Sequence, residues 1–384
     1  MNTTYPVTGN SAEQPLVFVI EALTVGGAEQ MLIAMANRFS ERGYPVHVVC
    51  LSQWGELVDS LNPKIERHLL DKKLGMDPKL PGRIRRLIKS IKPAAVNSHL
   101  FTANFWTRLS LIGTGTRIVV TEHSRDAWKG FFYRTIDRVF IHTCHKLVAV
   151  SNDTAKFYTD DVKVKATKVG VINNGIETAV YSNGDGQSLR QQWLEDYVDA
   201  SEREQCVFVG IVGRLVDAKN HGRLVEAAAQ WKETAPHIRT LIVGDGPLAD
   251  DIDQDIQKYQ LNKHVFRLGS RRDVPDILSA LDIFVLSSDR EGHPLTALEA
   301  QAAGTPVVLT RAGGCEDAVA KEGDKTGGIL VNKDADEFAQ AVATMANDAG
   351  MREQMATFAQ DYAMKHFDLD RMVDRYAEVL LENV

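Results

Sequence analysis

IFVLSSDREGHPLTALEAQAAGTPVVLT, at positions 283–310, is the stretch that indicates the fold most clearly. It begins with the apolar run Ile283–Ser287, which predicts a buried strand, and it ends with a second such run at Pro306–Thr310. Between these runs, Pro294 suits the first turn of a helix, and Gly304 is typical of a helix end. A strand, a helix and a second strand in this order favour a parallel sheet covered by helices.

The same alternation continues along most of the 384 residues. Before residue 180, we expect strands at Leu16–Ile20, Val46–Leu51, Ala94–Ser98, Arg117–Thr121, Lys146–Ser151 and Val169–Asn173. After residue 205, we expect strands at Val207–Val212, Thr240–Val243, Val265–Leu268, Ile283–Ser287 and Pro306–Thr310. The sequence therefore predicts an α/β protein with one domain at 1–180, a linker at 181–205, a second domain at 206–365 and a final helical segment at 366–384.

The composition is that of a globular protein that is not embedded in a membrane. Hydrophobic residues make up 44% of the chain and charged residues 25%, which excludes a disordered or fibrous class. The four cysteines form no C-x-x-C pair, so neither a zinc ribbon nor a disulfide framework is expected. The apolar runs fall far short of the roughly 18 residues of a membrane helix, and the first residues do not resemble a secretory signal. We therefore expect a cytoplasmic protein.

The charge is distributed unevenly. Residues 1–190 carry 24 Lys and Arg against 17 Asp and Glu, whereas the whole chain has a net charge of −7. A basic half favours an anionic partner, but no nucleic-acid recognition motif is present, so nucleic acid is not expected. The basic stretch Lys72–Lys92 has two interpretations: peripheral contact with an anionic membrane, or a solvated helix whose apolar residues face the core.

Two segments could bind phosphate. The turn Thr24–Glu29 contains Gly26 and Gly27 and precedes an expected helix, so it is either a phosphate cradle or simply a tight turn. Arg214 and Lys219 follow an expected strand, where open α/β sheets bind ligands. These two cations could neutralise a diphosphate without a metal, or they could be ordinary solvated side chains.

Two glutamates flank the start of the helix in the opening stretch. Glu291 precedes it, and Glu299 lies within it among Ala and Leu. A buried carboxylate needs hydrogen-bond donors, which ribose or sugar hydroxyls would supply. The alternative is that Glu299 is an ordinary solvent-facing helical residue.

Other patterns are weaker. His123 and Asn174 each follow an expected strand and could line a site, although single residues of these types are more often structural. The Gly244-Asp-Gly246 segment lacks the acidic residue that would bind a nicotinamide dinucleotide. His142-Thr-Cys144-His145 lacks a fourth metal ligand at a suitable spacing. No metal site is therefore expected.

Taken together, the Gly-Gly-Ala-Glu turn, the Gly-Arg-Leu…Lys-Asn segment, Gly-Asp-Gly-Pro and the Glu-x7-Glu stretch resemble the retaining glycosyltransferases of family 4, also called group 1. The resemblance extends from about residue 16 to the C-terminus. It implies the GT-B fold, in which two Rossmann-like doubly wound domains face each other across a cleft and the last helix returns to the first domain.

The resemblance also implies roles for individual residues. Arg214 and Lys219 would hold the donor diphosphate, Glu299 the ribose and Glu291 the sugar, while His123 would lie beside the transferred sugar. The Gly26-Gly27 loop would close over the diphosphate, Leu268–Ser270 would lie near the base, and Asn174 would line the cleft. His293 would help to select the donor sugar. The donor-binding set is Gly26, Gly27, Asn174, Arg214, Lys219, Leu268, Gly269, Glu291, Gly292, His293, Pro294, Leu295 and Glu299; the catalytic set is His123, Glu291, Arg214 and Lys219.

The expected activity is metal-independent, cofactor-free and retaining transfer from a nucleotide diphosphosugar, with a UDP-sugar as the expected donor. The expected acceptor is a glycan or a lipid-linked sugar in bacterial surface polysaccharide or lipopolysaccharide synthesis, at the inner face of the membrane. The alternatives are a hydrolysing nucleotide-sugar 2-epimerase of the same fold and a non-catalytic nucleotide-sugar-binding subunit. A NAD-dependent oxidoreductase is a more distant alternative.

Overall fold

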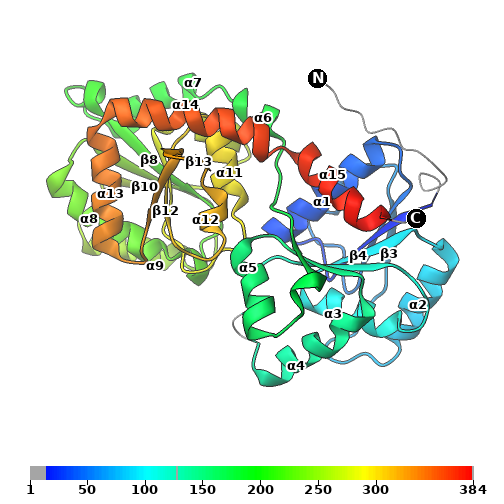
Figure 1. Cartoon of the computed structure of the whole chain (residues 1–384). Helices are drawn as coiled ribbons and strands as arrows, with labels where there is room; N and C mark the ends of the chain where they lie inside the picture. Colours follow the sequence, from blue (N-terminus) through cyan, green and yellow to red (C-terminus); the bar gives the residue numbers. More distant parts are fainter. Residues whose placement is uncertain (1–13, 127–128, 383–384) are drawn as a thin grey trace. The chain divides into compact units, whose positions relative to one another are not determined.

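The computed structural model describes residues 14–126 and 129–382. These residues form two compact units (Figure 1). The first unit contains the described residues up to Gly175 together with those from Leu369 onward, and the second unit comprises Ile176–Asp368. This division differs from the expected domain boundaries. The segment 181–205 is not a linker, because its helix α7 (Gln187–Tyr197) places Trp193 in the hydrophobic core of the second unit.

The first unit contains a parallel sheet whose described strands follow the order β3-β2-β1-β4-β5-β6-β7. The strands are β1 (Leu16–Ile20), β2 (Val46–Cys50), β3 (Glu66–Leu69), β4 (Ala95–His99), β5 (Ile118–Glu122), β6 (Lys146–Ala149) and β7 (Val169–Val171). The helices are α1 (Gly27–Glu41), α2 (Leu80–Ile91), α3 (Leu100–Ser110), α4 (Phe131–Phe140), α5 (Asn152–Lys156) and α15 (Leu369–Leu381).

Helices cover both faces of this sheet, because its central strand β1 is apolar on both sides. Phe18 belongs to the core beneath α1 and α15, whereas Val17 and Val19 belong to the core beneath α2 and α3. Figure 1 shows the C-terminal helix α15 beside α1. An ion pair with an N–O distance of 2.6 Å, between Arg42 and Asp374, joins these two helices.

The second unit repeats the architecture with the described strand order β10-β9-β8-β11-β12-β15. Its sheet strands are β8 (Val207–Val212), β9 (Ile238–Val243), β10 (Val265–Gly269), β11 (Ile283–Leu286), β12 (Val307–Thr310) and β15 (Gly328–Val331), and a small hairpin pairs β13 (Lys321–Glu322) with β14 (Lys325–Thr326). Besides α7, its helices are α6 (Thr178–Ser182), α8 (His221–Thr234), α9 (Ala249–Lys258), α10 (Val274–Ala280), α11 (Leu295–Ala302), α12 (Cys315–Ala318), α13 (Ala335–Asn347) and α14 (Ala349–His366).

In both sheets the direction of winding reverses at one point. It reverses between β1 and β4 in the first unit and between β8 and β11 in the second. At such a point the loops that follow the two neighbouring strands diverge and leave a crevice at their carboxyl ends, where open α/β sheets bind ligands. The fold therefore identifies two loop pairs, one in each unit, as candidate binding positions.

Candidate functional site

The loops that follow β8 and β11 are joined by hydrogen bonds. The hydroxyl of Ser287 donates to the carbonyl of Lys219 at 3.1 Å, and the amide of Asp289 donates to the carbonyl of Ala218 at 2.8 Å. From the first turn of α8, Arg223 bonds the carbonyl of Ser287 at 2.5 Å and the carboxylate of Asp289 at 2.8 Å. These contacts hold both loops of the second switch point in one arrangement.

Two of the predicted site residues meet on these loops. The Nζ atom of Lys219 lies 2.7 Å from Oε1 of Glu291, and the hydroxyl of Ser288 donates to the same oxygen at 2.6 Å. The side chains of Lys219 and Glu291 are 20% and 9% exposed. Within the described residues, both bonds end at Oε1, which leaves Oε2 of Glu291 able to accept a hydrogen bond from a ligand hydroxyl.

Arg214 lies nearby, directly after β8. Its side chain is exposed and makes no hydrogen bond or ion pair with any described residue. A Cβ atom on Gly244 would overlap the carbonyl of Gly213, and one on Gly246 would overlap that of Leu215. These glycines therefore allow the loop after β9 to pack against the backbone on either side of Arg214.

The predicted base-binding residues lie farther along the same edge. Leu268 and Gly269 end β10, which is separated from β8 by β9. The carbonyl of Gly269 accepts a hydrogen bond from the amide of Gly244 at 2.8 Å. This bond ties the end of β10 to the loop that packs beside Arg214.

Glu299 is buried in α11 and is only 8% exposed, so the interpretation as a solvent-facing residue is wrong. Burial raises the pKa of its carboxyl to about 7, although a hydrogen bond from the hydroxyl of Tyr181 and the charge of Lys219 oppose this rise. Tyr181 belongs to α6 and was not predicted. No local pattern could reveal it, because it meets Glu299 only through tertiary packing.

The segment from Gly292 to Leu295 leads into α11. Pro294 is the residue that caps this helix, and Leu295 begins it. His293 is buried, with its ring against Phe367 and its Nε2 atom 3.3 Å from the carbonyl of Asp317. Burial lowers the pKa of this imidazole to about 4. Because these contacts turn the ring toward the protein interior, its role in selecting the sugar stays a prediction.

In the first unit, the glycine turn after β1 carries its own carboxylate. Gly26 caps α1, and Gly27 begins it. A Cβ on Gly26 would overlap the carboxylate of Glu29, which also bonds the side chain of Thr24. Burial raises the pKa of Glu29. Since a carboxylate already lies at the positive end of this helix, phosphate binding by the turn stays a prediction.

His123, which follows β5, is held by a residue that the sequence analysis missed. Nδ1 of His99, at the end of β4, lies 3.0 Å from Nε2 of His123. On its other side, Nε2 of His99 lies 2.8 Å from Oδ1 of Asn97. The amide nitrogen of Asn97 donates to Val119 and Thr121, so its oxygen must face His99.

This chain of contacts determines the tautomers of both rings. Since Oδ1 of Asn97 is an acceptor, His99 carries its proton on Nε2, and its Nδ1 accepts from Nε2–H of His123. His123 is therefore left with a lone pair on Nδ1, which can accept a hydrogen bond from a hydroxyl. Burial lowers the pKa of both rings, which keeps the pair neutral. A histidine at the end of a predicted strand was the signal that could have identified His99.

The last predicted residue, Asn174, follows β7 and is buried at 6% exposure. Its neighbour Asn173 donates from its side-chain amide to the carbonyl of Val150. The structure thus places Asn174 at the carboxyl end of the first sheet, three strands away from His99.

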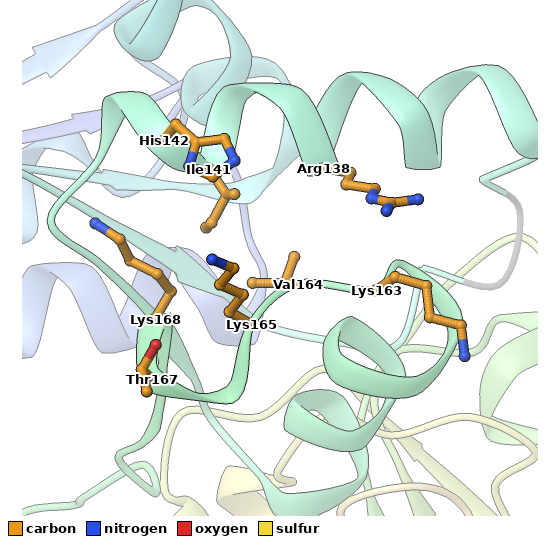
Figure 2. Close-up of a pocket in the computed structure, with 8 residues that line it drawn as sticks. All are labelled: Arg138, Ile141, His142, Lys163, Val164, Lys165, Thr167 and Lys168. Carbon is orange, nitrogen blue, oxygen red and sulfur yellow. The ribbon is translucent and has the colours of Figure 1, made fainter.

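Figure 2 shows a basic pocket elsewhere in the first unit, with a volume of about 460 Å³. Its lining consists of Arg138, Ile141, His142, Lys163, Val164, Lys165, Thr167 and Lys168. These residues precede β6 or β7, so they gather toward the amino-terminal ends of the strands. The pocket is therefore separate from the predicted site residues, which follow the strands.

The basic stretch Lys72–Lys92 contains α2. Ile84 and Ile88 of this helix are buried in the core, as the interpretation as a solvated helix requires. Arg85, Arg86 and Lys89 point away from that core and are exposed. Membrane contact through them stays a prediction. No helix within the described ranges is both long enough and apolar enough to cross a membrane.

Two family models match the chain, one in each half. The model described as Glycosyltransferase Family 4 matches residues 25–180, and the model described as Glycosyl transferases group 1 matches residues 196–362. The chain is 25% identical over 381 residues to the UDP-Gal:alpha-D-GlcNAc-diphosphoundecaprenol alpha-1,3-galactosyltransferase of Escherichia coli, covering 94% of this chain and 95% of the relative.

Solved structures share the fold along nearly the whole chain. Anabaena Alr3699/HepE in complex with UDP matches with a TM-score of 0.80 and 22% identity, covering 96% of this chain and 99% of the other. A glycosyltransferase from Rickettsia africae ESF-5 matches with a TM-score of 0.83 and 18% identity, covering 97% and 100%.

Proposed function

Because this chain belongs to the family 4, group 1 glycosyltransferases and has their GT-B fold, we propose that it transfers a sugar from a UDP-sugar to a glycan or lipid-linked acceptor, with retention of anomeric configuration. The product is proposed to enter bacterial surface polysaccharide or lipopolysaccharide synthesis.

The main support for this proposal is the ion pair between Lys219 and Glu291 at the switch point between β8 and β11. A cation and a carboxylate with one unengaged oxygen suit a diphosphate joined to a polyhydroxylated sugar. The buried carboxylate of Glu299 lies within α11, the helix that follows Glu291 along the chain. It suits a ribose diol, since each hydroxyl supplies the donor that a buried carboxylate needs. The second unit thus offers complementary groups for three parts of one donor.

The chemistry then follows from charge. Breaking the bond between sugar and phosphate leaves negative charge on the departing diphosphate, and Arg214 and Lys219 stabilise it as it develops. Oε2 of Glu291 accepts from a sugar hydroxyl and holds the ring. The proposed role of His123, in the first unit, is to accept a hydrogen bond from a sugar hydroxyl through Nδ1. The acceptor oxygen then bonds to the anomeric carbon on the face that the diphosphate leaves, and its proton passes to the departing phosphate, which gives retention without a covalent nucleophile.

Support for the acceptor class comes from a relative. The Escherichia coli enzyme is named for a GlcNAc unit linked through diphosphate to undecaprenol. A lipid-linked acceptor requires the enzyme to work at a membrane surface. The exposed cations of α2 suit peripheral contact with anionic lipid at the inner face.

The test is release of nucleoside diphosphate from a panel of UDP-, GDP- and ADP-sugars, with and without EDTA and with a diphosphate-linked lipid acceptor. The proposal expects acceptor-dependent UDP release that survives EDTA, and proton NMR of the product should show the anomeric configuration of the donor. Efficient release of free sugar without acceptor would instead indicate the hydrolysing epimerase. Donor binding without any turnover would indicate a binding subunit.

A further inference from the structure

Two histidines and a glutamate come together on β2 and β3 of the first unit. The strands are parallel, and their register pairs His47 with Glu66 and Val49 with His68. Residues two positions apart on a strand share a face, so the side chains of His47, Glu66 and His68 all project from the same side of the sheet.

The three potential ligand atoms form a compact triangle. Nδ1 of His47 lies 2.9 Å from Nε2 of His68 and 3.4 Å from Oε2 of Glu66, and the remaining side measures 3.9 Å. Zinc in a tetrahedral site has bonds of about 2.0–2.2 Å, which places its ligands about 3.3–3.5 Å apart. The three measured sides lie around that spacing: the site forms when the 2.9 Å side between the two histidines widens and the 3.9 Å side shortens, each by about half an ångström.

Hydrogen bonds among the three side chains cannot satisfy all three of these nitrogen and oxygen atoms. Two neutral imidazoles share one proton between the facing nitrogens, and that proton cannot also serve the carboxylate. Oε2 of Glu66 thus lies 3.4 Å from His47 Nδ1 and 3.9 Å from His68 Nε2, and one of these two nitrogens offers it a lone pair instead of a proton. A divalent cation at the centre would accept all three lone pairs at once.

The surroundings suit an ion with one open position. His47 is buried, His68 is partly buried and Glu66 is exposed, so the triangle is closed by the protein on one side and open to solvent on the other. Two histidines and one carboxylate are a common zinc ligand set in which water takes the fourth position.

We propose that this cluster binds one Zn²⁺ through His47 Nδ1, His68 Nε2 and Glu66 Oε2, with water as the fourth ligand. His47 and Glu66 lie at the amino-terminal ends of their strands, whereas the predicted sugar-transfer residues follow strand carboxyl ends. The ion is therefore separate from donor chemistry. Its effect is to hold the edge strand β3 against β2.

Metal binding by tag-free protein stripped with EDTA tests this inference. After dialysis against Zn²⁺, elemental analysis should find one zinc per chain, and Co²⁺ should give the intense visible absorption of a four-coordinate site. We expect His68→Gln and Glu66→Gln to weaken Zn²⁺ binding at least tenfold. His237→Gln, a change in the second unit, should leave it unaltered.

Thermal melting separates loss of the site from loss of the fold. Zn²⁺ should raise the melting temperature of the wild type but not of His68→Gln, while the two metal-free proteins should melt at similar temperatures. Absence of stoichiometric zinc in the wild type, or unchanged binding in both ligand variants, would overturn the proposal. Neither result would bear on the proposed glycosyl transfer.

Discussion

Nζ of Lys219 lies 2.7 Å from Oε1 of Glu291, although the two residues are 72 positions apart in the chain. The bond joins the loop after β8 to the loop after β11, and Ser288 donates to the same oxygen. Lys219 therefore does two things in the proposed mechanism: it supplies charge for the diphosphate, and it orients the carboxylate that holds the sugar.

This shared role predicts coupling between the two side chains. Lys219→Met and Glu291→Gln should each lower kcat/KM by roughly 10–150-fold, since a hydrogen bond to a charged group contributes about 1.5–3 kcal/mol. The double variant should lose less than the product of the two single losses, because either change already breaks the pair. Steady-state kinetics with the preferred donor measures all three values. Lys263→Met, at an exposed lysine of the same unit, is the control. If the loss of kcat/KM in the double variant equals the product of the two single losses, the shared role is wrong.

The pKa of about 7 for Glu299 predicts pH-dependent nucleotide binding. The ionised carboxylate accepts from both ribose hydroxyls, so UDP affinity should fall by up to about tenfold per pH unit below pH 7. Glu299→Gln is the control, because UDP itself titrates identically in both experiments and only the wild type has the carboxyl at position 299. Tyr181→Phe removes a donor that lowers this pKa, so the dependence should move to higher pH. Identical profiles for wild type and Glu299→Gln would count against a ribose contact.

The same shift has a consequence for stability. Between the ordinary value of 4.5 and about 7, the folded protein holds a proton at Glu299 that the unfolded chain has released. This group's contribution to stability is therefore fully present below pH 4.5 and is lost as pH rises through 7. Urea denaturation at pH 5 and pH 8 should show a larger loss of unfolding free energy in the wild type than in Glu299→Gln.

The His99–His123 contact predicts one tautomer for each ring. Nitrogen-15 NMR of histidine-labelled protein should show both rings neutral at pH 7 with the proton on Nε2. His99→Leu removes the acceptor that orients His123, and we expect kcat/KM to fall by about tenfold, corresponding to roughly one hydrogen bond. A proton on Nδ1 of His123 in the wild type would contradict the assigned acceptor role.

A buried ionic cluster should make the stability of the first unit sensitive to the loss of a single carboxylate. Asp137 accepts from Arg108 at 2.6 Å and from Lys129 at 2.9 Å, and all three side chains are at most 2% exposed. Asp137→Ala leaves two cations without this carboxylate and should lower the free energy of unfolding by about 3–5 kcal/mol. Asp160→Ala, at an exposed site, should change it by less than about 1 kcal/mol, as measured by urea denaturation.

The architecture could be predicted because its central strands are apolar on both faces. Leu16–Ile20 and Val207–Val212 have the bounds that their apolar runs predict. The edge strands β3 and β15 were missed. β3 is Glu-Arg-His-Leu, with no apolar run, because it is paired on one side only and its first two residues are exposed.

The candidate site was predictable only where its residues follow predicted strands. Lys219 and Glu291 do so, and their strands proved to be neighbours. Tyr181 could not be predicted, because its contact with Glu299 depends on how α6 packs against α11. The prediction of a linker at 181–205 was wrong because most of its residues are polar, and a single buried side chain in α7, that of Trp193 in the second core, gives no periodic pattern.

Calorimetric titration of UDP into the wild type, Lys219→Met and Glu299→Gln, with Lys263→Met as control, decides whether the donor nucleotide binds at the loops after β8 and β11. We predict UDP binding at one site per chain, at least tenfold weaker in Lys219→Met and Glu299→Gln and unchanged in Lys263→Met. Wild-type binding that neither site variant weakens, or no binding by the wild type, would contradict the assignment of the donor site to the loops after β8 and β11.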